Sequence, residues 1–276
     1  MRRRKFRRTE TTKNQTMKLL TTSLLLALLA ANALPARAQE HRYAVIEYMH
    51  IPETQSDDAY LATEKLWQRL HQKAVDAGIC RAWYLERVEN GGRGDFATIR
   101  IYDSLEKMRN PWPEAIQKDL FNAEETKTMS HTEETRDLIR RELWEIEASA
   151  VPDSGGDPST YVSLQFMKAK PGRDSEYFKM EKETYTKIHM ARVKTGEMKN
   201  WHFLSRMFPS GTDSDADYVT INVYPTKEMR WNSQIVETAL GKDAAARLAD
   251  PTTIRTMVRS ELWRPILGTK APAKKS

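Results

Sequence analysis

Two stretches of the chain, residues 43–85 and 161–203, align with each other at a constant offset and without a gap. The correspondence resumes between residues 95–102 and 217–224, and both copies end in an Arg-x-x-x-Arg-x-Glu-Leu-Trp sequence. The identical pairs include Tyr43 with Tyr161, Met49 with Met167, His71 with His189, Gly78 with Gly196, and Trp83 with Trp201. Two copies of about 110 residues are too few for a solenoid, but they suit two small domains that pack against each other.

Residues 1–38 have the pattern of a secretory signal peptide with a basic extension. A basic start at 17–18 precedes an apolar stretch over 19–34 and a small-x-small cleavage site at 36–38. The apolar stretch is short for a membrane anchor, so we expect cleavage and no stable membrane insertion afterwards. The sequence therefore predicts export to the periplasm or the extracellular space. It leaves the true start open between Met1 and Met17.

The basic balance of the chain comes from this leader. The whole chain has 44 Lys and Arg against 38 Asp and Glu; residues 1–38 hold nine of the former and one of the latter, which leaves 35 against 37, near −2. No later segment combines a basic stripe with interleaved aromatic residues, so we do not expect nucleic-acid binding. Cys80 is the one cysteine, which excludes an intrachain disulfide. The histidines lack the spacing of a metal site.

Apolar alternation and turn signals predict the same order of elements in both copies. For the first copy, residues 42–150, we expect strand 43–51, helix 57–77, strand 81–88, strand 96–102, broken helix 104–141 and strand 143–147. For the second copy, residues 160–267, we expect strand 161–168, helix 174–195, strand 198–206, strand 218–224, broken helix 226–260 and strand 262–264. Residues 151–159 have the composition of a linker, and residues 268–276 that of a disordered tail.

Each copy is therefore expected to be a βαββαβ unit of the ferredoxin-like type. Such a unit has a four-stranded antiparallel sheet with helices on one face, and its other face needs a cover. Two linked units can pack sheet against sheet and close into a barrel-like core. We predict an α+β fold in which two tandem ferredoxin-like units form an intramolecular dimeric α/β barrel.

The second copy also carries the motif Ile188-His189-x-x-x-Val193-x-x-Gly196, followed by a strand that contains Trp201. With this motif the sequence resembles the dimeric α/β-barrel superfamily, which includes NIPSNAP-like, EthD-like and antibiotic-biosynthesis monooxygenase domains, and above all its secreted bacterial members. The resemblance covers most of residues 42–266. It implies the fold but no single activity, because the superfamily spans many chemistries. Some related barrels bind haem, but nothing here marks an axial ligand, so we expect no cofactor.

Strand alternation assigns side chains to the two faces of each sheet. Apolar positions shared by both copies, such as Ala44 with Val162 and Ile46 with Leu164, are expected to face the helices. The opposite face would then line a polar and aromatic barrel cavity. The ligand-binding residues expected there are Tyr43, Glu47, Trp83, Arg100, Tyr102, Tyr161, Gln165, Trp201, Asn222 and Tyr224.

Glu47 and Arg100 in the first copy are replaced by Gln165 and Asn222 in the second. Buried charges are costly unless they are paired, so Glu47 and Arg100 should compensate each other if they meet. Two interpretations stay open. The pair belongs either to an asymmetric polar pocket that works mainly in the first half, or to a structural salt bridge.

His71 and His189 are the candidate catalytic residues. Each lies four residues after an aromatic residue, Trp67 or Tyr185, and therefore on the same helix face. Each also lies near the C-terminal end of its helix, where the dipole alone would favour a charged histidine. The functional alternative is a general base or a ligand-orienting donor at the barrel rim.

Two arginine pairs, Arg136 with Arg140 and Arg255 with Arg259, are expected to share a helix face in each copy. They form either an ion-pair cluster at the helix end or a clamp for an anionic ligand.

No motif in the chain names a reaction. The sequence has no Gly-rich phosphate loop, no G-x-S-x-G elbow and no Cys-His nucleophile arrangement. We expect an exported protein that binds a small organic molecule in its barrel cavity, with catalysis undecided and a homo-oligomer compatible with the sequence. One alternative is a cofactor-independent oxygenase or isomerase-like enzyme. The other is a structural or assembly protein, whose barrel should contain no cavity of about 300 Å³.

Overall fold

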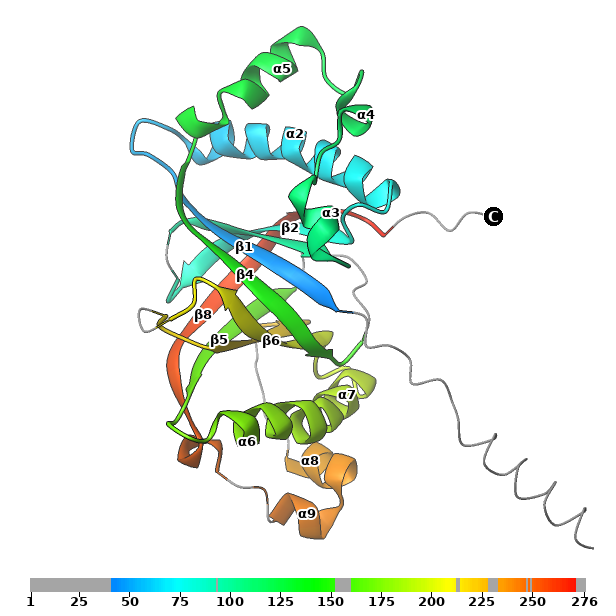
Figure 1. Ribbon diagram of the computed structural model, residues 1–276, viewed down its shortest axis with the longest axis vertical. Helices are drawn as coiled ribbons and strands as arrows, with labels where there is room; N and C mark the ends of the chain where they lie inside the picture. The colour runs from blue at the N-terminus through cyan, green and yellow to red at the C-terminus, as the bar shows by residue number, and fades with distance from the viewer. Residues whose placement is uncertain are drawn as a thin grey trace, which may run out of the picture. The chain divides into compact units, whose positions relative to one another are not determined.

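The computed structural model describes residues 41–92, 94–151, 160–211, 214–227, 233–246, 248 and 250–271 (Figure 1). The expected signal peptide lies outside these residues, as do nearly all of the expected linker and the end of the expected tail. The described residues belong to one unit that begins at His41. None of the described helices is long and apolar enough to cross a membrane.

The first half of the fold, residues 41–151, is a four-stranded antiparallel sheet with helices on one side (Figure 1). Its main helix starts where the side chain of Ser56 accepts a hydrogen bond from the Ala59 amide at 3.2 Å, and it stops before Gly78, whose φ is +69°. The elements are β1 (Arg42–His50), α2 (Asp57–Asp76), β2 (Ala82–Asn90), β3 (Phe96–Tyr102), α3 (Leu105–Arg109), α4 (Glu114–Gln117), α5 (Ala123–Ser130), the 3₁₀ turn η1 (Thr132–Glu134) and β4 (Asp137–Ser149).

The second half, residues 160–271, repeats this order of strands and places its helices beside its own sheet. Its elements are β5 (Tyr161–Ala169), α6 (Asp174–Lys179), the π-helical segment η2 (Met180–Tyr185), α7 (Thr186–Lys194), β6 (Asn200–Phe208), β7 (Tyr218–Tyr224), α8 (Ser233–Leu240), α9 (Lys242–Ala246), η3 (Pro251–Thr253) and β8 (Arg255–Gly268). Matching strands have the same register: Tyr43 lies opposite Tyr102, and Tyr161 lies opposite Tyr224.

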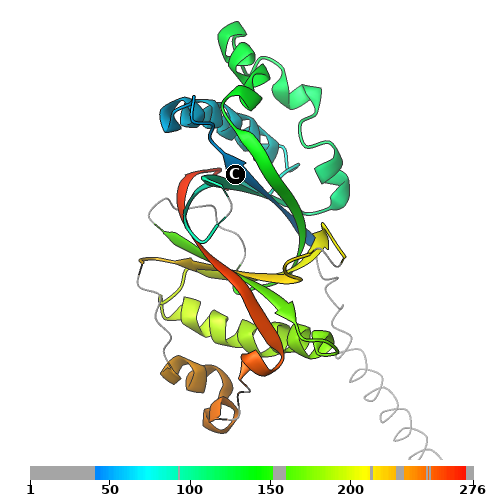
Figure 2. The same cartoon turned by 90° about the vertical axis from the view of Figure 1, so that its left-hand side faces the viewer.

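The two sheets close into one eight-stranded barrel in the order β1-β3-β2-β8-β5-β7-β6-β4. Two strands close it, because β4 pairs with β1 of its own half and β6 of the other, while β8 pairs with β5 and β2. Figure 2 looks into this barrel, with the helices of the two halves on opposite sides. The predicted α+β fold with an intramolecular dimeric α/β barrel is confirmed.

The closing strands start earlier than the sequence predicted. Residues 137–141 and 255–260 were expected in helices, but they lie in β4 and β8, which run for 13 and 14 residues. The four-residue spacing of their arginines fits a helix face, whereas in the structure a bulge interrupts the alternation of each strand between the two arginines. The expected tail is also wrong in part, because Thr269 is buried and its amide donates to the Trp83 carbonyl at 2.9 Å.

The gapless sequence alignment hides a one-residue shift between the two main helices. Tyr60 and Tyr177 are both fully buried, and each packs against an aromatic residue of the third strand of its half, Phe96 at 4.6 Å and Tyr218 at 5.1 Å between ring centroids. The alignment instead matches Tyr60 with Phe178. The π-helical segment at 180–185 holds the extra residue of the second helix, so the two helices return to the same alignment after it.

The predicted faces of the strands are reversed. The shared apolar residues line the barrel interior, where those of both halves form a single core: Ala44, Ile46, Tyr48, Ala97, Ile99, Ile101, Val162, Leu164, Phe166, Val219 and Ile221. The backbone groups of the strands are paired within the closed sheet, so a polar side chain in the barrel needs a partner from another side chain. On the helix-facing side, the helices can also supply such partners.

Candidate functional site

The predicted ligand-binding residues therefore lie between each sheet and its helices, and not in the barrel. In the second half, four of them line a cavity of about 370 Å³, which we call the outer cavity, together with the candidate catalytic residue His189. Those four are Gln165, Trp201, Asn222 and Tyr224, and the cavity is completed by Met167, Glu181, Tyr185, Arg192, Thr220 and Arg255. Tyr43 and Tyr161 do not line it.

In the first half, the corresponding space is filled by charged and aromatic side chains. Arg100 pairs with Glu47 at 2.8 Å, and Arg141 donates to the other carboxylate oxygen of Glu47 at 2.6 Å. Trp112 lies beneath the guanidinium of Arg100, 5.6 Å from ring centroid to Cζ. Burial alone would raise the pKa of Glu47, but Arg100 and Arg141 together hold it below its ordinary value. The pair is a structural salt bridge, which was one of the two interpretations left open.

His71 is likewise enclosed in the first half. Its ring stacks on Trp83 at 5.0 Å, and the rings of Trp67 and Trp112 lie 6.1 and 5.7 Å away. Burial, with Arg100 adding a positive charge, lowers the pKa of His71 well below its ordinary value. The imidazole is therefore neutral and packed among tryptophans. Tyr102 and Trp83 are buried in the same layer and line no described cavity.

In the second half, two neutral amides, Gln165 and Asn222, replace the charged Glu47 and Arg100 of the first. Asn222 turns its amide toward the sheet and donates to the Ser163 carbonyl at 3.2 Å. Gln165 stands where Glu47 stands in the first half, since each lies opposite a threonine of the neighbouring strand. The outer cavity belongs to the second half, whereas the interpretation as an asymmetric pocket placed the working pocket mainly in the first half.

His189 forms part of the wall of the outer cavity. Its ring stacks on Trp201 at 4.7 Å, and its Nδ1 is buried without a hydrogen-bond partner. Burial, together with the charge of Arg192, lowers the pKa of His189 to about 3. A base with so low a pKa takes up a proton poorly near neutral pH, so a neutral hydrogen-bonding role suits His189 better than general-base catalysis.

Glu181 is the carboxyl group of the outer cavity, and the sequence analysis missed it. It is 3% exposed and lies in the π-helical segment. Burial raises its pKa to about 7, against the lowering effects of Tyr177 and Arg255. The gapless alignment pairs Glu181 with Thr63, but after the one-residue shift its counterpart is Glu64, which is also buried. The match between Glu64 and Glu181 was the sequence signal for this position, but the gapless alignment does not place the two glutamates opposite each other.

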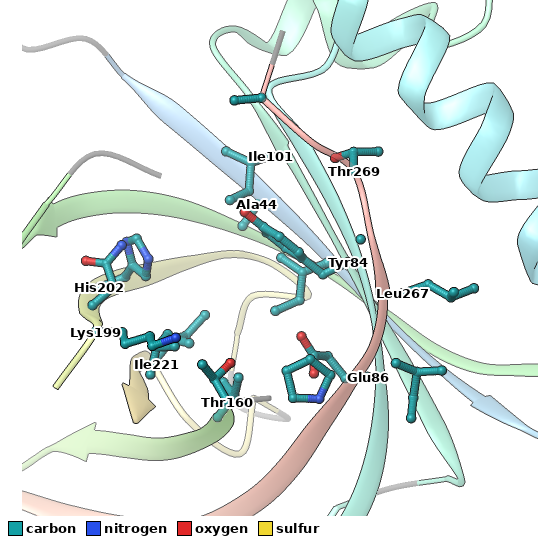
Figure 3. Close-up of a pocket in the computed structure, with 18 of the residues that line it drawn as sticks. Ala44, Tyr84, Glu86, Ile101, Thr160, Lys199, His202, Ile221, Leu267 and Thr269 are labelled. Atoms are coloured by element: carbon teal, nitrogen blue, oxygen red, sulfur yellow. The ribbon is translucent and has the colours of Figure 1, made fainter. Parts of the chain in front are cut away.

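A larger cavity of about 620 Å³, which we call the barrel cavity, lies inside the barrel (Figure 3). Most of its wall is apolar, with Glu86, Tyr84 and His202 as the main polar side chains on the strands. None of these three was predicted to bind a ligand. A signal for Glu86 was present, because its counterpart in the second copy is the apolar Leu204.

Interlocked ion pairs occupy the other part of the barrel. Arg206 pairs with Asp215 at 3.0 Å and with Glu142 at 3.5 Å, and Arg259 pairs with Glu261 at 2.7 Å. Arg140 pairs with the same carboxylates, whereas Arg136 lies outside the barrel and pairs with Glu64. Arg140 and Arg259 are thus neutralised by carboxylates, so for these two the interpretation as an ion-pair cluster fits, whereas Arg255 lines the outer cavity. Among the residues that the structure describes, no group of three or more His, Cys, Asp or Glu could hold a metal ion.

No family model and no curated protein sequence matches the chain. Among solved structures, a candidate monooxygenase from Lactobacillus acidophilus NCFM is 10% identical, covers 85% of this chain and 98% of its own, and has a TM-score of 0.51. A candidate monooxygenase from Fusobacterium nucleatum subsp. nucleatum ATCC 25586 is also 10% identical, with 86% and 98% covered and a TM-score of 0.50. At this identity the likeness concerns the fold alone. With the closed eight-stranded barrel, it shows that a single chain here has the fold of the dimeric α/β-barrel proteins.

Proposed function

We propose that this protein binds a small organic molecule with acceptor oxygens in the outer cavity of its second half. The observation that carries the proposal is a pair of buried donors in the cavity wall, the indole Nε1 of Trp201 and the Nε of Arg255, neither of which has a hydrogen-bond partner. Buried donors in native proteins are almost always satisfied, and an oxygen of a bound ligand would satisfy both. A carbonyl, phenolic or carboxylate oxygen has this chemistry.

The other residues of the wall favour a flat, aromatic ligand. Tyr185, Trp201 and Tyr224 contribute rings, while Gln165 and Asn222 contribute neutral amides. The wall thus combines aromatic rings with polar and charged groups, and about 370 Å³ lies within the usual range of small-molecule sites. This site replaces the predicted one in the barrel but keeps four of its ligand-binding residues and the candidate catalytic residue His189.

The second candidate is an enzyme of the cofactor-independent oxygenase or isomerase-like type, and Glu181 favours it. A carboxyl with a pKa of about 7 exists in both protonation states near neutral pH, as a general acid–base group requires. In this mechanism the Glu181 carboxylate takes a proton from the bound molecule, and the guanidinium of Arg255 stabilises the anion that forms. His189 orients the ligand through a hydrogen bond. An assembly protein is disfavoured, because the barrel holds a cavity of about 620 Å³.

The test exchanges the residues at these two matched positions between the halves of the protein. The double variant Gln165→Glu/Asn222→Arg recreates the Glu47–Arg100 pair and should fill the outer cavity, whereas Glu47→Gln/Arg100→Asn is the matched change in the first half. Binding of 2-naphthol is measured by calorimetry, alongside native mass spectrometry of residues 39–276. We expect 2-naphthol binding to be lost in the first variant and kept in the second. Equal binding by the wild type and the filled variant would contradict the proposal.

The enzyme alternative is tested separately, with a matched glutamate of the first half as the control. If the protein is an enzyme, Glu181→Gln removes activity while Glu64→Gln, the matched change in the first half, keeps it. Activity should rise with pH through about 7, because the base form of Glu181 is the deprotonated one. A pH profile without a rise near 7 would exclude Glu181 as the base.

Export and the absence of a tightly bound cofactor also stay predictions. N-terminal sequencing of the protein from a periplasmic fraction tests cleavage after Ala38, and an absorption spectrum tests the expectation that no haem is bound.

A further inference from the structure

The barrel cavity has a shape and composition distinct from those of the outer cavity. Its walls come from both halves: Ala44 of β1 and Val162 of β5 lie on strands that are opposite in the barrel order, as do Glu86 of β2 and His202 of β6. Figure 3 shows the carboxyl of Glu86 directed toward the cavity, with His202 across from it. A ligand here would contact both sheets at once.

Glu86 is the feature of this cavity that packing does not explain. The side chain is 4% exposed, its Oε2 has no hydrogen-bond partner, and no cation pairs with it among the described residues. Burial raises the pKa of Glu86 well above its ordinary value, which favours the protonated carboxylic acid. A neutral acid carries one O–H donor, and this donor faces an apolar cavity.

The rest of the wall defines what could accept that hydrogen bond. Ile99, Ile101 and Ile221 form apolar surface, and the counterpart of Glu86 on the opposite sheet is Leu204. The exposed Lys199 and Lys270 contribute to the lining where it meets solvent. Two cations beside the entrance disfavour a positively charged ligand, although an amine could otherwise pair with the Glu86 carboxylate.

We propose that the barrel cavity is a second binding site for a neutral, largely apolar molecule with a carbonyl-type oxygen, which accepts a hydrogen bond from the Glu86 carboxyl. The site is separate from the outer cavity and does not depend on the function proposed there. About 620 Å³ lies in the middle of the range for small-molecule sites. The hydrogen bond gives a ligand with one terminal oxygen a defined orientation among apolar walls.

The experiment uses prodan, a naphthalene ketone whose fluorescence changes in apolar surroundings and when its carbonyl accepts a hydrogen bond. Prodan is titrated into the full-length mature protein and into three variants. Ala44→Phe places a ring in the cavity and should abolish binding. Glu86→Leu removes the donor and should weaken binding about fivefold to tenfold, whereas Glu86→Gln keeps a donor and should bind nearly as well as the wild type.

The outer-cavity variant Gln165→Glu/Asn222→Arg separates the two proposals. Prodan binding in the barrel should survive it, so a loss of prodan affinity in this variant places the probe in the outer cavity and overturns the inference. Binding that persists in Ala44→Phe also overturns it, as does an affinity unchanged in Glu86→Leu. If Ala44→Phe fails to fold, Val162→Phe fills the same cavity from the opposite strand, with thermal unfolding as the check on folding.

Discussion

Glu86 shows how a single carboxyl can remain buried without a cation. Its pKa is raised by burial alone, and apolar residues of the barrel core surround it. A raised pKa means that the folded state holds its proton more tightly than the unfolded chain. The resulting stability is complete below the ordinary glutamate pKa of 4.5 and is lost as the pH rises toward the folded-state value.

We therefore expect Glu86→Leu, which copies Leu204, to raise stability more at pH 8 than at pH 4. Near neutral pH the gain should be about 1–3 kcal/mol, the usual cost of an unpartnered buried polar group. Denaturant unfolding of the wild type and the variant at both pH values measures it. Glu86→Gln is the control that keeps the shape but does not titrate. An identical pH dependence in all three proteins would show that Glu86 is not buried as a neutral acid.

The two histidines should differ in their contribution to stability although they occupy matching positions. His71 is enclosed by three tryptophan rings, so His71→Ala leaves a new void and should cost about 2–4 kcal/mol. His189 borders the existing outer cavity, so His189→Ala should cost about 1 kcal/mol. Chemical denaturation of both variants checks the order. Equal losses, or a larger loss at His189, would mean that the outer cavity is filled in solution.

At the residue scale, several predicted site residues lie together, but not where the sequence placed them. Trp201 and Asn222, expected to bind a ligand, and His189, a candidate catalytic residue, line one cavity. Their predicted location was wrong because alternation separates the two faces of a sheet but does not say which face lines the barrel. Glu181 was missed because the gapless alignment assigned it the wrong partner. Burial and pKa depend on all neighbours of a side chain, and those are not visible in one strand or helix.

At the element scale, the π-helical segment decides the composition of the outer cavity. Tyr177, Glu181 and His189 are spaced by four and eight residues, whereas Tyr60, Glu64 and His71 in the first half are spaced by four and seven. The extra residue is held within 180–185, so that residues on both sides of it still reach the sheet. Such a bulge costs helical hydrogen-bond geometry, and its position beside a cavity supports a functional reason for keeping it.

Deleting the exposed Glu183 should convert this segment into a regular α-helix. The deletion restores the spacing of the first half, so we expect a folded protein whose stability changes by less than about 1 kcal/mol. The matched deletion of the exposed Lys65 in α2 breaks a regular register and should unfold the protein or cost several kcal/mol. Circular dichroism and thermal unfolding compare the two. A Glu183 deletion as damaging as that of Lys65 would mean that the bulge is required for folding.

The element order could be predicted because turns and alternation are local. The starts of β4 and β8 could not, because their first residues are in strands only through pairing with a partner strand. Leu138 pairs with Met49, and Met257 pairs with Met167, across a bulge in each case. Both apolar side chains are exposed, at 51% and 45%, so these positions carried no signal of a buried strand face.

At the scale of the whole molecule, the barrel closes because the edge strands of the first half pair with edge strands of the second. The strand pairs β4 with β6 and β2 with β8 join the halves, and they also enclose the apolar face of each sheet. A sheet with helices on one side needs a second sheet to cover its other face, so the pairing of the two halves was predictable. The barrel cavity was not predictable, because its volume depends on how the side chains of both halves pack together.

The two halves should therefore be unable to fold alone as monomers, yet able to pair with themselves. Residues 41–151 and 160–271 each expose an apolar sheet face and two unpaired edge strands, and their matching registers allow a symmetric barrel of two identical copies. The two homodimers should differ in stability.

A dimer of the first half brings two Glu86 carboxyls into one barrel, whereas a dimer of the second half brings two copies of Leu204. We expect the second dimer to unfold at the higher temperature at pH 8, and Glu86→Leu to narrow the gap. Light scattering after gel filtration, followed by thermal unfolding, measures both properties. A cooperatively folded monomer of either half would show that closure of the barrel is not what stabilises its sheet.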